Sequence, residues 1–225
     1  MEISKKHNLW FTIINAFLFI STVIVTIITL SFGTVASQVD TSVTEGWFYI
    51  VTFTVQSNIL LGLVALVAMI FGIRSLKTSK PLPRSLITWY LVASSAAMLT
   101  AITVIFFLAP SRAILKGRNY FDMMLGPMFF FHFFNPFLSA FTFIFLTPKE
   151  KIAKKSCFFA VIPTAAYAVP YVLNVVILKT WVDFYGFTFG GHVWTVFPVF
   201  LVMSGITLGI AALLAFLHNK QIKDA

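Results

Sequence analysis

The sequence has few charged residues and a single cysteine, Cys157. Only 10% of its 225 residues are Asp, Glu, Lys or Arg, whereas a typical soluble domain has about 25%. It contains no P-loop, no pair of metal ligands at i, i+4 spacing and no Gly-x-Ser-x-Gly motif. These absences exclude an intramolecular disulfide and the common nucleotide-binding and serine-hydrolase signatures, and they predict a protein without a metal or other cofactor.

Apolar residues, by contrast, make up 59% of the chain, which includes 27 phenylalanines. A chain of this length cannot bury so much apolar surface in a water-soluble core, because its surface-to-volume ratio is too high. A lipid bilayer removes that limit. The formal net charge of +9 does not indicate a nucleic-acid partner, since nearly all Lys and Arg lie in short segments between the apolar runs. We therefore predict a single all-α membrane domain over residues 1–225.

Six segments have the ~20 apolar residues that a helix needs to cross ~30 Å of hydrocarbon. They are Leu9–Val35, Trp47–Ile73, Leu86–Ala109, Phe121–Leu146, Cys157–Leu178 and Val193–Leu217. The first follows two lysines, as a signal peptide does, but its apolar run is much longer than the ~7–15 residues of a signal sequence. We therefore expect it to be retained, which gives a polytopic bundle of six transmembrane helices.

The basic residues are distributed unevenly between the two sides of this bundle. Twelve fall on the side of the termini: Lys5, Lys6, Arg74, Lys77, Lys80, Arg84, Lys149, Lys151, Lys154, Lys155, Lys220 and Lys223. The other side holds Arg112, Lys116, Arg118 and Lys179. Because cytoplasmic loops carry the excess of Lys and Arg, the count predicts that both termini are cytoplasmic.

No Asp, Glu, Lys or Arg falls deep within any of the six predicted spans, but one histidine does. His132 lies among phenylalanines about 11 residues, or ~16 Å, from the outer end of the Phe121–Leu146 span. Asn135 follows on the same helical face, and Pro136 removes a backbone donor so that a carbonyl one turn earlier is freed. An intramembrane ionisable residue is a functional candidate. The alternative is a packing histidine that is hydrogen-bonded to a neighbouring helix.

The Trp47–Ile73 span carries a second cluster of polar residues, Thr52, Thr54, Gln56, Ser57 and Asn58. Thr54, Ser57 and Asn58 share one face, at an expected depth of ~10–16 Å that matches His132. A hydroxyl and an imidazole that meet in a dry cavity form a nucleophile–base pair. The alternative is that each hydroxyl bonds back to the carbonyl one turn earlier.

Side-chain amides near this pair are candidates for binding an oxyanion or a substrate. Gln56, Asn58 and Asn135 can donate to an oxyanion. Asn174 lies about two turns inside the outer end of the Cys157–Leu178 span, and Asp183 belongs to an aromatic outer loop that can reach the mouth of a cavity. The alternative for this loop is a purely interfacial role.

The chain resembles the androgen-induced and androgen-dependent membrane proteins and their bacterial six-helix relatives. The resemblance rests on Phe53-Thr54-x-x-Ser57-Asn58, on His132 followed by Pro136, on Pro170-Tyr171, and on Trp181…Asp183-Phe184-Tyr185. Animal members of this family are intramembrane threonine hydrolases that cleave esters of hydroxy fatty acids. The resemblance implies Thr54 as nucleophile, His132 as base, a membrane lipid as substrate and a bacterial plasma membrane as location. Because the local spacing departs from the family pattern, Thr52 and Ser57 are rival nucleophiles.

Three functions remain open at this point. The first is an intramembrane lipid esterase that uses Thr54 and His132. The second is a six-helix module that binds or transports a small molecule, in which the same polar residues form a ligand cage. The third is a structural membrane protein without chemistry. No carboxylate lies deep in a span, which argues against proton-coupled transport, and the oligomeric state is left open.

Overall fold

The computed structural model describes residues 5–33 and 46–223, and within these ranges every regular element is a helix, which confirms the predicted all-α class. Five helices are long and apolar enough to cross a membrane. They are Lys5–Phe32 (α1), Phe53–Thr78 (α3), Arg84–Lys116, Ser156–Ile177 and Val193–Ile222. The third consists of α4 (Arg84–Thr103) and α5 (Ala109–Lys116), joined by a π-helix, and the fourth contains α7 (Ser156–Phe159) and α8 (Ile162–Tyr171). Most of the fifth is α9 (Val196–Lys223).

The fourth predicted span, Phe121–Leu146, is shorter than expected. Its first residues form a 3-10 helix at Tyr120–Met124, and the apolar helix begins only at Phe130 and runs to Leu146. The break lies at Gly126 and Pro127, because Gly126 adopts a φ of 60° and a proline has no N–H to donate. The described residues therefore contain five helices of full spanning length and one shorter apolar helix.

The second predicted span also begins later than expected. Residues Gly46–Val51 form a 3-10 helix, and α3 starts at Phe53, where Thr52 is the N-cap and accepts a hydrogen bond from the N–H of Val55. The other predicted spans agree with the helices to within a few residues at most ends, although the third helix continues to Lys116. The predicted end of the first span, Val35, lies outside the described residues.

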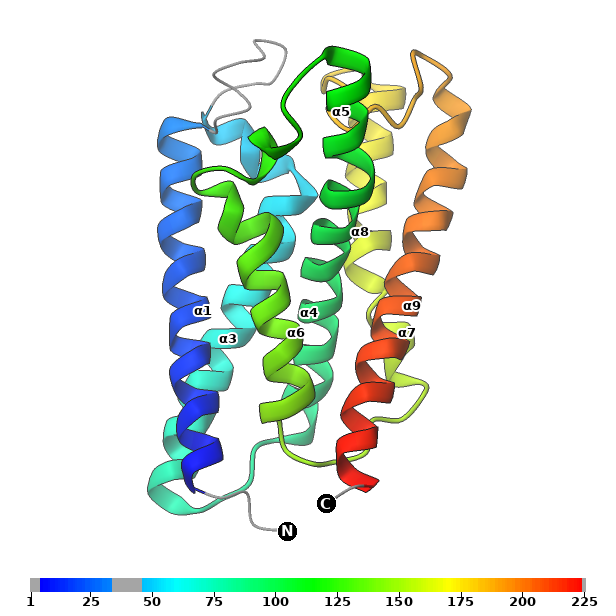
Figure 1. Cartoon of the computed structure of the whole chain (residues 1–225). Coiled ribbons are helices and arrows are strands. Elements are labelled where there is room, and N and C mark those ends of the chain that lie inside the picture. Colours follow the sequence, from blue (N-terminus) through cyan, green and yellow to red (C-terminus); the bar gives the residue numbers. More distant parts are fainter. Residues whose placement is uncertain (1–4, 34–45, 224–225) are drawn as a thin grey trace.

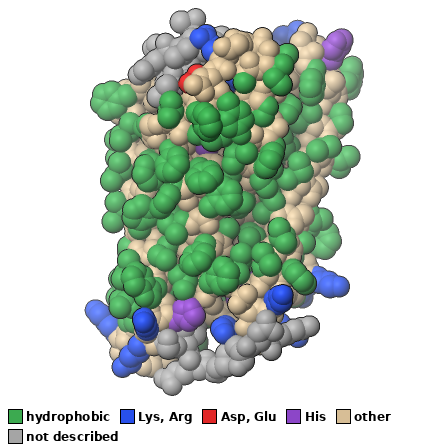
Figure 2. Space-filling view, in the orientation of Figure 1, with side chains coloured by type: hydrophobic (Ala, Val, Ile, Leu, Met, Phe, Trp, Pro, Cys, Tyr) green, Lys and Arg blue, Asp and Glu red, His purple; other side chains and the backbone are tan. Residues whose placement is uncertain are grey.

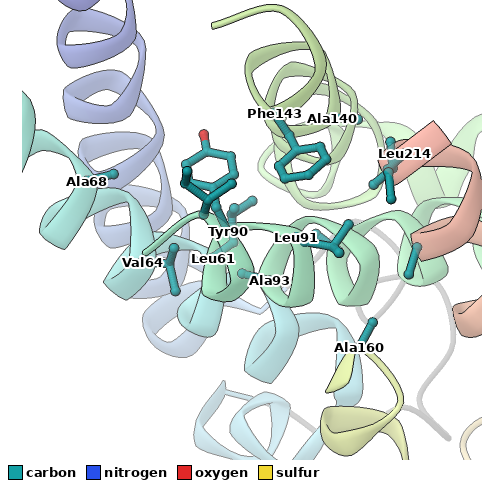
Figure 3. Packing of buried hydrophobic residues seen from close by; sticks show 14 of the residues in the cluster. Leu61, Val64, Ala68, Tyr90, Leu91, Ala93, Ala140, Phe143, Ala160 and Leu214 are labelled. Atoms are coloured by element: carbon teal, nitrogen blue, oxygen red, sulfur yellow. The ribbon is translucent and has the colours of Figure 1, made fainter. Parts of the chain in front are cut away.

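The helices lie side by side as a bundle, and the start of α1 and the end of α9 are at the same end (Figure 1). Its central helix is α4, which contacts α3, α6 (Asn135–Leu146) and α9. Figure 3 shows this core, in which Tyr90 and Leu91 of α4 lie near Phe143 of α6, Leu61 of α3 and Leu214 of α9. The core thus joins segments that are far apart in the sequence.

Helices α1 and α3 pack closely because glycines on α3 face threonines on α1. A Cβ atom on Gly62 would lie 2.7 Å from Cγ2 of Thr22, and one on Gly72 would lie 2.3 Å from Oγ1 of Thr12. Both distances are shorter than van der Waals contact. Small residues that allow helix backbones to approach are typical of helix pairs in membranes.

Two segments of the bundle widen from α-helix to π-helix just before a proline. Phe130–Phe134 precedes Pro136, and the N–H of Asn135 donates to the carbonyl of Phe130, five residues back. In the same register, residue 136 would donate to Phe131, but Pro136 has no N–H. The side-chain Nδ2 of Asn58, on α3, donates to this Phe131 carbonyl instead, at 3.2 Å.

The same compensation occurs at the second site, the π-helix Val104–Leu108, which precedes Pro110. Here the N–H of Ala109 donates to the carbonyl of Val104. Because Pro110 has no N–H, the carbonyl of Ile105 has no backbone donor in the same register. The hydroxyl of Tyr120 donates to that carbonyl at 2.9 Å. Backbone groups freed in an apolar interior need such partners, because hydrocarbon supplies none.

The surface of the bundle is divided into an apolar middle and two basic ends. Figure 2 shows apolar side chains over the middle of the visible face and Lys and Arg side chains at both ends. Large apolar side chains are exposed on every long helix, for example Ile27, Ile70 and Leu201. A water-soluble monomer rarely exposes contiguous apolar surface on this scale, so the surface is consistent with a multi-pass membrane protein.

Candidate functional site

Thr54 and His132 line one cavity, at the end of the bundle opposite the start of α1. This cavity has a volume of about 600 Å³ that includes space open to solvent, and it is called the polar cavity below because Thr52, Arg112 and His132 are among its otherwise largely apolar lining residues. Its lining residues are Tyr49, Thr52, Thr54, Val55, Leu108, Arg112, Met123, Met128, His132, Phe184 and Tyr185. The predicted nucleophile and the predicted base therefore lie on different helices and line the same cavity.

Both residues lie closer to the ends of their helices than the sequence predicts. Thr54 is the second residue of α3, and His132 is the third residue of the helix that begins at Phe130. Both helices begin at the same end of the bundle, and the two residues line the same cavity there. Their depth in a membrane stays a prediction.

The imidazole of His132 is held by the chain segment that precedes its own helix. Its Nδ1 lies 2.5 Å from the carbonyl oxygen of Met123, and the side chain is only 4% exposed. A carbonyl can only accept, so Nδ1 carries the proton and Nε2 keeps its lone pair. Among the described residues no hydrogen-bond partner to Nε2 is found. This tautomer is the one that a general base needs.

Thr54 is positioned together with a tyrosine from the outer loop. The hydroxyl of Tyr185 accepts the backbone N–H of Phe53 at 2.8 Å and also interacts with the side chain of Thr54. Tyr185 thereby covers the start of α3 and lies beside the candidate nucleophile. Sequence reasoning placed Tyr185 only within the aromatic loop, because a contact across 132 residues leaves no local pattern.

Asp183 holds the outer loop and does not line the cavity. Its carboxylate accepts hydrogen bonds from the hydroxyl of Tyr171, from the N–H of Phe187 at 3.0 Å, and from the N–H and hydroxyl of Thr188 at 2.7 and 2.6 Å. Burial raises the pKa of this carboxyl, but the hydrogen bonds from Thr188 and Tyr171 outweigh it and hold the pKa below its usual value. Asp183 therefore acts on the cavity through the loop that carries Tyr185.

Ser57 and Asn58, the other members of the polar face on α3, are engaged in packing. The hydroxyl of Ser57 donates to the carbonyl of Thr54 at 3.1 Å and lies 2.9 Å from the hydroxyl of Thr100 on α4. The amide nitrogen of Asn58 donates to the carbonyls of Thr54, at 2.9 Å, and Phe131, at 3.2 Å. Both of its N–H groups are used, so Asn58 is not available to an oxyanion in this conformation.

The remaining amides predicted for the site lie outside it. Gln56 is exposed and donates to the carbonyl of Ile50 at 3.1 Å. Asn135 is buried and accepts from Ser21 on α1 at 3.0 Å. Asn174 donates to the carbonyl of Pro170 at 2.8 Å and accepts from a threonine in the following loop. Each of these contacts holds helices or loops together.

Thr52 does line the polar cavity, but its hydroxyl has partners. It donates to the carbonyl of Tyr49 at 2.7 Å and accepts from the N–H of Val55 at 3.4 Å. These are the bonds of an N-cap residue. Of the three hydroxyl groups that compete as nucleophile, that of Thr54 is the one that faces the cavity without a capping bond.

A second cavity adjoins the first. This apolar cavity has a volume of about 400 Å³, which includes space open to solvent. It is lined by Phe53, Thr54, Leu99, Thr100, Thr103, Val104, Leu108, Thr164, Tyr167, Tyr185, Phe187, Phe200 and Met203. Three residues, Thr54, Leu108 and Tyr185, belong to both linings. Thr54 therefore stands at the junction of a polar and an apolar space.

Arg112 is the charged residue of the lining, and the sequence did not predict it for the site. It was counted only as a charge on the sparsely basic side, but α5 carries it into the lining of the polar cavity, where it is partly buried. The signal in the sequence is an arginine that follows Pro110 directly after an apolar run. Among the described residues no group of three His, Cys, Asp or Glu side chains is placed to hold a metal ion.

The fold and the cavities define an all-helical protein whose long apolar helices enclose a polar pocket at one end. Comparison with protein-family models, with curated proteins and with solved structures finds no significant match. The resemblance to the androgen-induced membrane proteins stays a prediction.

Proposed function

We propose that the chain crosses a bacterial plasma membrane six times, with both termini in the cytoplasm. The helix Phe130–Leu146 is the sixth span. At 1.5 Å per residue it is about 25 Å long, which nearly covers the hydrocarbon thickness. It packs against α1 and α4 inside the bundle. The excess of Lys and Arg at the end that holds the termini supports the orientation.

We propose that the protein is an intramembrane hydrolase of fatty acyl esters, with Thr54 as nucleophile and His132 as base. The observation that carries the proposal is that these two side chains line one cavity while Nε2 of His132 is left free to accept a proton. The adjoining apolar cavity suits an acyl chain. Neither feature requires a cofactor.

The reaction follows from these positions. When Oγ1 of Thr54 comes within about 3 Å of Nε2 of His132, the imidazole takes its proton and Oγ1 attacks the ester carbonyl. The ester C–O bond breaks, and the alcohol leaves with the proton from the imidazolium. Water then attacks the acyl-threonine and gives its proton to Nε2, which releases the fatty acid and returns the proton to Thr54. The hydroxyl of Tyr185, which lines the same cavity, is the candidate donor to the oxyanion, since Asn58 is engaged elsewhere.

Labelling with a fluorophosphonate probe tests the nucleophile. The purified full-length protein should be labelled, and Thr54→Ala should abolish labelling. Thr52→Ala and Ser57→Ala are matched controls that each remove a hydroxyl from the same helical region, and both should keep the label. If all three variants are labelled like the wild type, a hydroxyl nucleophile at this site is ruled out.

A second candidate function is binding or transport of a small molecule without catalysis. The observation that favours it is the pair of adjoining cavities, which forms a larger space than a catalytic dyad needs. A ligand that co-purifies in equal amount with wild type and Thr54→Ala, together with absent turnover of acyl esters of any chain length, would select this function over the hydrolase.

A further inference from the structure

Arg112 brings a permanent positive charge to the polar cavity. No Asp or Glu belongs to the lining of either cavity. In the part of the chain that the structure describes, the one ion pair joins Arg84 to Glu150, at the opposite end of the bundle. Asp183, the acidic residue of the nearby loop, directs its carboxylate to Tyr171, Phe187 and Thr188.

A partly buried cation in such a cavity is costly, because it loses water and no described carboxylate lies within ion-pair distance of it. An anionic ligand offsets that cost. The guanidinium of arginine also presents two parallel N–H groups, a geometry that matches the two oxygens of a carboxylate or a phosphate. The lining of the polar cavity thus has the chemistry of an anion site.

The two cavities together have the polarity of an amphiphile. Arg112 lies at the end of the bundle, whereas Leu99, in the lining of the apolar cavity, lies 13 positions earlier on the same continuous helix. That separation corresponds to about 20 Å along the helix axis. In the six-span topology proposed above, the charged end lies at the level of the lipid headgroups and the apolar end reaches toward the hydrocarbon, with Thr54 in the lining of both cavities.

We propose that the joined cavities bind a single-chain anionic lipid, with its carboxylate or phosphate on Arg112 and its tail in the apolar cavity. A role of this lipid as substrate or product rests on the proposed hydrolase function, but binding of the lipid does not depend on it. A Thr54→Ala protein should bind it as the wild type does.

The test measures binding of radiolabelled ligands to the full-length Thr54→Ala protein in phosphatidylcholine nanodiscs. Hexadecanoate, hexadecyl phosphate, hexadecanol and inorganic phosphate are compared. We expect at least one of the two anionic lipids to bind tenfold or more tightly than hexadecanol, and the stronger of the two shows whether the group is a carboxylate or a phosphate. Inorganic phosphate should bind far more weakly than hexadecyl phosphate.

Variants at Arg112 show whether this preference comes from the proposed site. Arg112→Gln should remove the preference for the anionic lipid and leave hexadecanol binding unchanged, which also shows that the variant is folded. Arg112→Lys should keep part of the preference. Lys179→Asn is the matched control, since it removes an exposed charge from the same end and asparagine tolerates the positive φ of that residue.

Three outcomes overturn the proposal: equal binding of the acids and the alcohol, an anion preference that survives Arg112→Gln, or inorganic phosphate that competes as well as hexadecyl phosphate. Failure of the hydrolase proposal is separate. It appears as unchanged fluorophosphonate labelling in Thr54→Ala, whereas failure of the anion site appears as unchanged lipid binding in Arg112→Gln.

Discussion

His132 donates from Nδ1 to the carbonyl oxygen of Met123 across a distance of 2.5 Å. The bond joins two residues nine positions apart, and the chain between them turns at Gly126 and Pro127, which brings the segment before the helix back onto the ring. The same break that shortens the fourth predicted span therefore selects the tautomer of its histidine. A continuous helix from Phe121 would place Met123 more than two turns away along the axis and leave the ring without this acceptor.

The first prediction separates the two roles of His132. His132→Gln keeps an N–H donor for the Met123 carbonyl but cannot act as a base. We expect fluorophosphonate labelling to slow by about 10²–10⁴-fold, the usual contribution of a general base, with little change in thermal stability. His132→Leu should both slow labelling and lower the melting temperature, because it leaves the carbonyl without a donor. Normal labelling in His132→Gln would remove the histidine from the mechanism.

The second prediction concerns Asn58 and Pro136. Asn58→Ala removes the donor to the Phe131 carbonyl, and we expect it to destabilise the protein by about 1–2 kcal/mol. Pro136→Ala restores a backbone N–H in this turn, so Asn58→Ala should cost less in the Pro136→Ala background. The measurement is a double-mutant cycle from equilibrium unfolding in mixed detergent. An equal cost of Asn58→Ala in both backgrounds would show that the proline and the asparagine are not linked.

The third prediction tests the close packing of α1 on α3. Gly72→Ala should destabilise the bundle by about 1–3 kcal/mol, because its Cβ would lie 2.3 Å from Oγ1 of Thr12. Thr12→Ala removes that atom and should rescue most of the loss. Gly209→Ala in α9 is the control, since no described atom lies within 4 Å of its Cβ position. This change should be neutral or stabilising through helix propensity. The measurement is the thermal unfolding of the four variants. A double variant of Gly72→Ala and Thr12→Ala that is as unstable as Gly72→Ala alone would contradict the contact.

The fourth prediction is a pH dependence that originates at Asp183. Its folded pKa is lower than its unfolded pKa, so its contribution to stability is fully present above about pH 5 and is lost as the pH falls through the folded pKa. Asp183→Asn should lower the melting temperature at pH 7 and flatten the decline of stability at acid pH. Hydrogen exchange at Phe187 and Thr188 reports the loop directly. A stability profile that is the same in wild type and Asp183→Asn down to pH 3 would contradict this role.

Much of the fold follows from the sequence because helix length and apolarity are local properties. Runs of about 20 apolar residues define most of the long helices, and a histidine or a threonine stands out within them as a polar exception. The later start of the fourth helix was also encoded locally, in Gly126 and Pro127. A hydropathy pattern passes over these two residues because neither interrupts the apolar run with a charge.

The composition of the site could not be predicted in the same way, because it depends on which distant segments of the chain meet in the fold. Asn58 and Phe131 are 73 residues apart, and Tyr185 reaches the N–H of Phe53 across 132 residues. The sequence placed Thr54 and His132 at one level because each helix sets its own depth. Only the tertiary structure shows that the amide of Asn58 donates to the Phe131 carbonyl, which lacks a backbone donor because of Pro136. It alone brought Arg112 into the cavity, because helix packing determines which face of a helix turns toward that space.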